Sequence, residues 1–233
     1  MKKWVALLVG VFLLIPSIYT LSILEVIKLR TFDALVPVEQ ETGNFVILDI
    51  SEDDLEREGG WPLPRKKLAE IHLKLLQKGA IGVGWGISFP QPDRLGGDEA
   101  FAEVLSYGGS VVAMFETDKW DTIPKTEGTV ILGDEAGGIE AKGVKENIPI
   151  IRQNTLQGIV SAPVDIDNLV RRMPLLMKSP EGWMASFGTQ LLKTATGTDT
   201  YVIKTNEFGI EEIRVRQLNP IPTDQFGRVW VNW

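Results

Sequence analysis

Residues 80–89 read AIGVGWGISF, an apolar run rich in glycine that lies between two stretches with helical spacing. The preceding stretch predicts a helix over residues 65–78, which Gly79 ends. Its inward face carries Leu68, Ile71, Leu75 and Leu76. The following stretch predicts a second helix over residues 98–107, with Asp98 as its N-cap. Its predicted inward-facing residues are Phe101, Val104 and Leu105.

Two further apolar runs complete a repeating order of strand and helix. NFVILDI at 44–50 predicts a buried strand before the first helix, and SVVAMF at 110–115 predicts another after the second helix. Strands that are apolar almost throughout favour parallel pairing with right-handed crossovers. We therefore expect an α/β fold with a mostly parallel central sheet flanked by helices. The alternate glycines 82, 84 and 86 lie inside a strand, so they indicate close packing and not a phosphate-binding loop.

The second half of the chain is less regular. Residues 116–158 predict an irregular, exposed insertion, in which TVIL (129–132) is a candidate strand. Beyond it we expect a helix near 184–193 and antiparallel additions at the C-terminal end. The strands of those additions are YVIKT (201–205), EEIRVRQL (211–218) and RVWVNW (228–233).

The N-terminus carries a long apolar segment. Residues 4–24 contain no charge and, as a helix, would span roughly 31 Å, about the thickness of the hydrocarbon core of a bilayer. With Lys2 and Lys3 before it, the segment predicts a signal anchor over residues 1–24, with the rest of the chain outside the cytoplasmic membrane. A cleaved signal peptide and a buried core helix are the alternatives. A juxtamembrane helix over 25–36, with Leu24, Ile27, Phe32 and Leu35 as its apolar side, would end before Pro37.

Composition excludes several classes of function. The chain has 233 residues and a net charge of -7, so we expect no nucleic-acid partner. It has no cysteine, which excludes disulfides, thiolate metal sites and a cysteine nucleophile.

The titratable residues do not combine into a catalytic set. His72, the only histidine, is expected to be a half-exposed helical residue. The acidic residues Asp49, Glu52, Asp53 and Asp54 follow the first strand, where α/β proteins place ligands, and form either a solvated turn or an acidic site. Asp165 to Asn168 predict a turn before Arg171 and Arg172, one of which would be partly buried against a carboxylate. We expect no catalytic residue, no metal and no cofactor.

Several sequence blocks together resemble a known family. They are FDAL (32–35), VILDI (46–50), GGWPLPR (59–65), GAIGVGWGISF (79–89), DIDNLVRRMPL (165–175) and IPTDQFGRVWVNW (221–233). In this order they resemble the second family of CHASE domains, the extracytoplasmic sensory modules of bacterial receptors. In that family the module is usually followed by transmembrane helices and a cytoplasmic cyclase or kinase. This chain would be either the sensory part of such a receptor or a free-standing version.

The chain departs from the family pattern at three positions. Gly86 stands in the second strand where an Asp is common, Ser51 replaces an Asp near the end of the first strand, and Asn168 stands where Gly is favoured. The resemblance implies a sensory domain over residues 37–233, periplasmic or extracellular. Its signal would be a small molecule or a protein, and the domain could form a homodimer.

We therefore predict a membrane-anchored sensor that binds a ligand without catalysis. The predicted ligand-binding residues, near the carboxyl ends of the first two strands, are Asp49, Trp61, Arg65 and Asp93. In GGWPLPR, Trp61 is expected to pack over the start of the helix. This structural role is the main one expected for Trp61, and ligand binding is the second. The alternatives are an interaction module that binds envelope proteins or full-length receptors without an output of its own, and a hydrolase.

Overall fold

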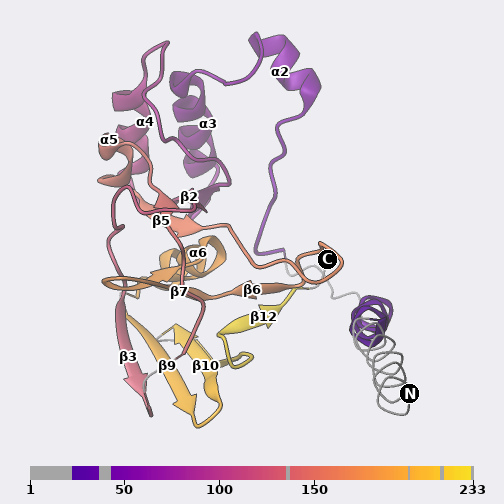
Figure 1. Cartoon of the computed structure of the whole chain (residues 1–233). Helices are drawn as coiled ribbons and strands as arrows, with labels where there is room; N and C mark the ends of the chain where they lie inside the picture. The colour runs from indigo at the N-terminus through magenta and orange to yellow at the C-terminus, as the bar shows by residue number, and fades with distance from the viewer. Residues whose placement is uncertain (1–22, 37–42, 135–136, 199, 216–217, 232–233) are drawn as a thin grey trace, which may run out of the picture. The chain divides into compact units, whose positions relative to one another are not determined.

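The computed structural model divides the chain into two units, which we describe separately. The described residues are 23–36, 43–134, 137–198, 200–215 and 218–231 (Figure 1). The small unit consists of Met1–Val46, Pro163–Arg172 and Trp230–Trp233. The large unit consists of Ile47–Ala162 and Met173–Val229. The chain passes from one unit to the other after Val46, after Ala162, and within the short strands β6 (Arg172–Pro174) and β12 (Arg228–Trp230).

A parallel sheet forms the centre of the large unit. β2 (Ser110–Glu116) pairs in parallel with β1 (Val83–Trp85) on one side and with β5 (Leu156–Ile159) on the other. The two-residue strand β4 (Val144–Lys145) pairs antiparallel with the end of β2. The first five residues of β2 are buried, as expected for a strand that is covered on both faces.

Helices cover both faces of this sheet. α3 (Arg65–Gln77), α4 (Asp98–Leu105) and α5 (Pro149–Arg152) lie on the face to which Trp85 points, and share one apolar core with it. α6 (Phe187–Thr196) lies on the opposite face (Figure 1). The predicted α/β class, with a parallel sheet flanked by helices, is confirmed.

Glycine lets α6 approach the sheet closely. A Cβ atom on Gly158 would lie 2.4 Å from the Phe187 Cα, and one on Gly84 would lie 2.8 Å from the Phe187 ring. Gly82 is crowded in the same way, by the backbone of the loop before β2. The expected close packing is therefore confirmed for Gly82 and Gly84, but Gly86 has no atom within 4 Å of its Cβ position.

A second sheet lies at the other end of the large unit. Its strands run in the order β11 (Ile221–Pro222), β10 (Gly209–Val215), β9 (Thr200–Asn206) and β3 (Gly128–Leu132). The pairs β9–β10 and β10–β11 are antiparallel, which confirms the antiparallel additions predicted for the C-terminal end. β3 pairs in parallel with β9. A separate hairpin joins β7 (Leu176–Ser179) and β8 (Gly182–Ala185).

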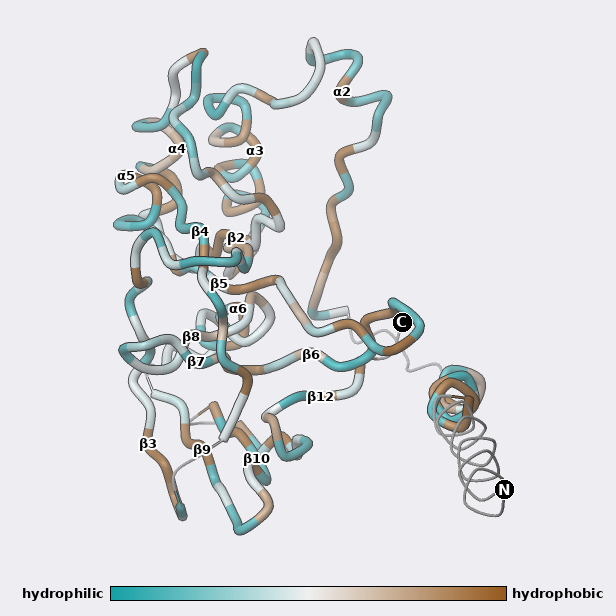
Figure 2. The backbone as a smooth tube through the Cα atoms, viewed as in Figure 1, coloured by the Kyte–Doolittle hydropathy of each residue, from teal (hydrophilic) through white to brown (hydrophobic). Residues whose placement is uncertain are grey.

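The prediction of a buried first strand is wrong in this structure. Residues 45–50 are extended but belong to no strand. The side chains of Phe45, Val46, Ile47 and Leu48 are 60 to 94% exposed. The segment leads instead to the short helix α2 (Glu52–Glu58), and Figure 2 shows its apolar colour along the extended tube. Backbone extension without a neighbouring strand leaves such side chains in water.

Three other expectations need correction. The strand predicted over 80–89 is regular only from Val83 to Trp85. Residues 116–158, expected to be irregular, contain β3, β4, α5 and the start of β5. The N-cap of α4 is Gly97, and Asp98 is the first residue of this helix. The Asp98 carboxylate binds Arg65 of α3, as described below.

The small unit contains a helix over residues 23–35. The expected helix is present. Phe32, on its predicted apolar side, is half-buried, but Leu24, Ile27 and Leu35 are more than half exposed, and the fully buried apolar residue is Leu29. Among the described residues no helix has the length and apolarity needed to span a membrane. Residues 1–22 of the predicted anchor lie outside the described part of the chain.

Candidate ligand-binding site

Arg65 is the first residue of α3, and its polar groups are directed inward. Its backbone N–H donates to Asp93 Oδ2 at 2.9 Å, and its guanidinium binds the Asp98 carboxylate and the Gln91 carbonyl. The guanidinium also lies 5.1 Å from the centre of the Phe89 ring. Only 7% of Arg65 is exposed. It therefore holds the helix start to the loop after β1, with little surface left for a ligand.

Asp93 stabilises the same helix start. The N-cap residue of α3 is Pro64, whose side chain cannot accept a hydrogen bond. The Asp93 carboxylate instead accepts the Arg65 N–H, and it also accepts the Leu95 N–H at 3.0 Å. Desolvation raises the pKa of Asp93, but these two hydrogen bonds outweigh it and hold the pKa below its usual range. Arg65 and Asp93 are thus neighbours, as predicted, in a structural role.

The other two predicted residues, Asp49 and Trp61, lie outside this hydrogen-bonded cluster in the described part of the chain. Asp49 is exposed in the segment 45–50, and Trp61 is 56% exposed, so Trp61 at most partly covers the helix start over which it was expected to pack. Gly59 and Gly60 have φ of 90° and 100°, which gives the sharp approach expected of them.

The acidic residues after position 50 form a helix start. Ser51 is the N-cap of α2, and its hydroxyl and N–H exchange hydrogen bonds with Asp54 in a capping box. The hydrogen bond from Ser51 lowers the pKa of Asp54. The solvated turn is therefore the better of the two interpretations. Within the described residues, no group of three or more potential ligands is arranged to hold a metal ion.

A polar cluster lies in the small unit, around Arg171. Its guanidinium binds both oxygens of Asp33, at 2.7 and 2.8 Å, and both oxygens of Asp167, at 2.8 Å each. Its Nη1 lies 3.4 Å from Asp165 Oδ2. Arg171 is 1% exposed. We call these four residues the arginine joint.

Local structure places the three carboxylates of the arginine joint. Asp33 lies on the helix 23–35, whereas Asp165 and Asp167 lie in a turn in which Asn168 has a φ of 62°. The turn is closed by hydrogen bonds from Asn168 N to Asp165 O and from Asp165 N to Leu169 O. The predicted turn, and the prediction that an arginine after it is buried against a carboxylate, are confirmed.

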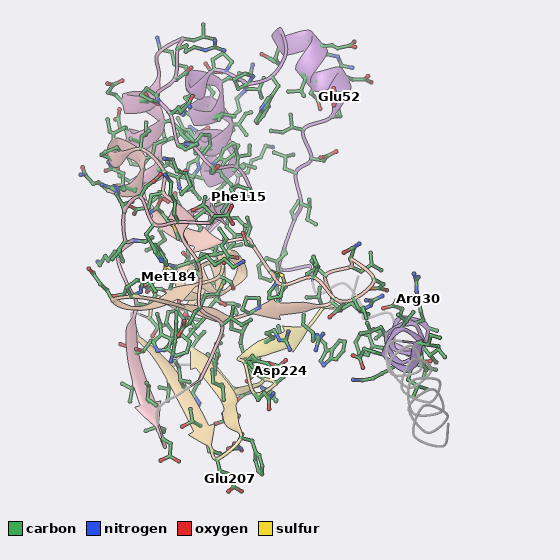
Figure 3. The ribbon with its side chains drawn as sticks, viewed as in Figure 1. Arg30, Glu52, Phe115, Met184, Glu207 and Asp224 are labelled. Atoms are coloured by element: carbon green, nitrogen blue, oxygen red, sulfur yellow. The ribbon has the colours of Figure 1, made fainter. Side chains whose placement is uncertain are left out.

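The guanidinium shifts the titration of its partners. The hydrogen bonds from Arg171 lower the pKa of Asp33 and lower that of Asp167 to about 2. Arg30, labelled in Figure 3, is on the same helix as Asp33, and its Nε lies 3.8 Å from Asp167 Oδ2. Asp33 and Asp167 are therefore ionised at neutral pH.

The end of the chain meets the same helix. The Phe32 and Trp230 rings have centroids 4.2 Å apart, and Val231 N donates to the Arg171 carbonyl at 2.8 Å. Arg172 binds Asp165 and lies 5.2 Å from the Trp230 ring. The arginine joint thus connects the helix 23–35 to residues at the C-terminal end. Asp33 was not among the predicted site residues, because it is 138 positions from Arg171 and no local pattern links the two.

His72 is fully buried between α3 and the sheet, so the expectation of a half-exposed residue is wrong. Trp85 Nε1 donates to His72 Nδ1 at 3.1 Å, and His72 Nε2 lies 3.2 Å from Ser110 Oγ. Because Nδ1 accepts a hydrogen bond, the neutral ring carries its proton on Nε2. That proton points to Ser110, so the ring cannot act as a base toward the Ser110 hydroxyl.

A recess of about 850 Å³ opens in the large unit, at the amino ends of β2 and β5. Its lining includes Gly108, Lys125, Arg152, Asn154, Gln157 and Thr194. The Thr194 hydroxyl is buried and has no hydrogen-bond partner within the described residues. The recess is at the opposite end of the strands from the site that sequence reasoning predicted. Its loops have no motif that would have identified them.

Comparison with known families gives one match. The model of a family described as the CHASE2 domain matches residues 6–233, almost the whole chain. Searches among curated proteins and among solved structures found no match.

Proposed function

The chain belongs to the CHASE2 domain family, a family of sensory domains of receptors, and on this premise we propose that it is a membrane-anchored, extracytoplasmic input module that binds its signal without catalysis. The apolar residues 4–24 would anchor it in the cytoplasmic membrane. The module itself would lie in the periplasm or outside the cell.

The observation that carries this proposal is the arginine joint. A sensor must transmit a change in its folded part to a segment that reaches the membrane. The helix 23–35 follows the apolar segment directly, and Asp33 holds it to the turn 165–168 through a buried arginine. Arg171 also contacts the C-terminal end through its carbonyl group. A change at the joint would therefore act on both ends of the chain.

The recess supports a small polar molecule as the signal. Its lining combines charged and amide side chains with the apolar Leu105, Ile123 and Leu156, and it includes Thr194, whose buried hydroxyl lacks a hydrogen-bond partner among the described residues. An unpaired buried hydroxyl costs free energy that a bound polar group would recover. The absence of catalysis is supported by the tautomer of His72, which leaves Ser110 without a base.

Three measurements test the proposal. The first is a thermal-shift screen of the full chain in detergent against small polar envelope metabolites and divalent cations. We expect a compound that raises the melting temperature, and a smaller rise with Thr194→Val, which removes the hydroxyl at nearly constant volume. A screen without any shift would contradict a small-molecule signal.

The second measurement separates sensing from simple binding. Because the chain has no cysteine, Lys28→Cys on the exposed side of the helix 23–35 can be labelled with one environment-sensitive fluorophore. We expect the compound to change the fluorescence, and Asp33→Asn to abolish this change while the thermal shift remains.

A β-lactamase fusion at the C-terminus should confer resistance if the module is exported, which tests the topology.

A further inference from the structure

The recess in the large unit carries a positive charge that is not balanced. Its lining contains two cations, Lys125 and Arg152, and one carboxylate, Glu146. Arg152 and Glu146 bind each other as an ion pair. The ammonium group of Lys125 is exposed and has no ion pair or hydrogen bond in the described part of the chain. The recess therefore presents one free cation, although the whole chain has a net charge of -7.

The carboxylate of Glu146 is already fully engaged within the protein. Thr122 Oγ1 donates to its Oε2 at 2.6 Å, Gln157 Nε2 donates to its Oε1 at 3.2 Å, and the Arg152 guanidinium binds it as well. Its side chain is only 8% exposed. Glu146 thus fixes Arg152 and Gln157 in the lining and neutralises Arg152, which leaves Lys125 to attract a ligand.

Ser110 adds an available hydrogen-bond donor to the same lining. The residue is 4% exposed, and its Oγ, 3.2 Å from His72 Nε2, accepts the proton that the ring carries there. In the described structure its own hydroxyl proton meets only the Gly108 carbonyl, at 3.5 Å, well beyond the usual O–H···O length of about 2.7–2.8 Å. An acceptor atom of a ligand would make a better partner for this buried group.

From these observations we infer that the recess binds a small monocarboxylate, whose carboxylate group pairs with Lys125 and accepts from Ser110. The inference rests on the proposed function and names the class of its ligand. One free cation beside a neutral hydroxyl donor matches a single negative charge. A phosphate group, with up to two charges and three acceptor oxygens, would need a second free cation.

The apolar part of the lining indicates what the rest of the ligand is. Leu105, Ile123 and Leu156 line the recess beside the polar groups, and Ile123 is 37% exposed. Covering such side chains with a short alkyl group removes apolar surface from water, which favours binding. The expected ligand is therefore a carboxylate with a short aliphatic chain, and not a sugar or a polyol.

Thermal-shift titration of the full chain in detergent tests the ligand class at neutral pH. The probes are acetate, butyrate, isovalerate and hexanoate, with isovaleramide as the uncharged match of isovalerate and inorganic phosphate as the other anion. We expect a saturable rise in melting temperature with isovalerate or butyrate, a smaller one with acetate, and none with the amide or phosphate. An equal rise with isovaleramide would overturn the role of charge, and an equal rise with phosphate would overturn the carboxylate class.

Variants of two exposed lysines locate the bound carboxylate. Lys125→Gln should weaken the binding of isovalerate by about tenfold or more, because a hydrogen bond to a charged group is lost. Lys142→Gln is the matched control, since it removes the same charge from an exposed position outside the lining, and it should leave the affinity unchanged. Equal affinities of the two variants, measured by calorimetry, would overturn the assignment of Lys125.

Ser110→Ala tests the hydroxyl donor in the same titration. It should weaken isovalerate binding several-fold, and an unchanged affinity would remove Ser110 from the site. If this variant does not fold, the comparison of Lys125→Gln with Lys142→Gln still decides the inference.

The outcomes separate this inference from the proposed function. If no carboxylate raises the melting temperature but a neutral polar compound does, and Thr194→Val reduces that rise, the carboxylate inference is wrong and a small-molecule signal stands. If neither the carboxylates nor any other compound shifts the melting temperature, both are wrong.

Discussion

The guanidinium of Arg171 binds both carboxylate oxygens of Asp33, across 138 positions of sequence, at 2.7 and 2.8 Å. The same guanidinium binds Asp167, so that one buried cation binds carboxylates from two separate segments. Loss of Arg171 would leave Asp33 without this cation and would leave Asp167, whose side chain is 10% exposed, with Arg30 at 3.8 Å as its remaining cation among the described residues. A poorly paired charge at such a position is costly.

Arg171→Ala should therefore lower the melting temperature strongly, on the order of 10 °C. Arg214→Ala is the matched control, because Arg214 is 44% exposed and its ion pair with Glu212 spans 4.0 Å. We expect the control to melt within about 1–2 °C of the wild type, since exposed ion pairs contribute little. Thermal unfolding followed by circular dichroism would measure both, and similar melting temperatures would contradict the role assigned to Arg171.

His72 should make stability depend on pH. Burial lowers the pKa of His72 from 6.5 to about 4. Between these values the unfolded chain binds a proton that the folded protein does not, so stability falls as the pH falls from 6.5 to 4. The loss should approach about 3 kcal/mol at pH 4, at 1.36 kcal/mol for each pH unit.

Urea unfolding at several pH values, with His72→Gln for comparison, would measure this dependence. The variant should be less stable at neutral pH but should lack the component between pH 6.5 and 4. An unchanged slope in the variant would assign the pH dependence to carboxylates instead.

Gly158→Ala should destabilise the large unit, because the added Cβ would lie 2.4 Å from the Phe187 Cα and 2.8 Å from its nitrogen. Backbone on both sides cannot move aside easily, so we expect a loss of about 1–3 kcal/mol or more. Gly86→Ala is the control, since it adds the same atom to a place with no neighbour within 4 Å. Chemical unfolding would compare them, and equal stability would show that α6 can shift.

Asp93→Ala should cost about 0.5–2 kcal/mol of unfolding free energy, the usual range for a lost helix cap. Its carboxylate accepts the first N–H of α3, and no other side chain caps that N-terminus in the described structure. Asp49→Ala, at an exposed position, should change stability by less than about 0.5 kcal/mol. If either substitution abolished the thermal shift caused by a ligand and left stability unchanged, the result would support the ligand-binding site predicted from the sequence.

The parts of the fold that sequence reasoning found are those with local signals. α3 follows from its apolar spacing and from Gly79, and β9 and β10 follow from their alternation. The run 44–50 has the composition of a strand, but a strand also requires a neighbour, and composition does not provide one. The error for His72 is of another kind. Four positions after Leu68, it lies on the buried side of α3, so the helical phase predicted its burial although its polarity suggested otherwise.

The candidate site was harder to predict because its contacts are long-range. The carboxylate of Asp33 and the guanidinium of Arg171 carry no sequence signal of their pairing, and the recess is built from loops without a motif. Arg65 and Asp93 were correctly placed together, but the sequence did not show that the Arg65 N–H donates to the Asp93 carboxylate.

The burial of the single histidine has a practical consequence for experiments in solution. The imidazole of His72 is the only one in the chain and contacts α3's neighbours Trp85 and Ser110 on two strands. Its ring protons would therefore give isolated NMR resonances without any labelling at other sites. Movement of α3 against β1 or β2 would shift these resonances, so the His72 signals would report changes in core packing.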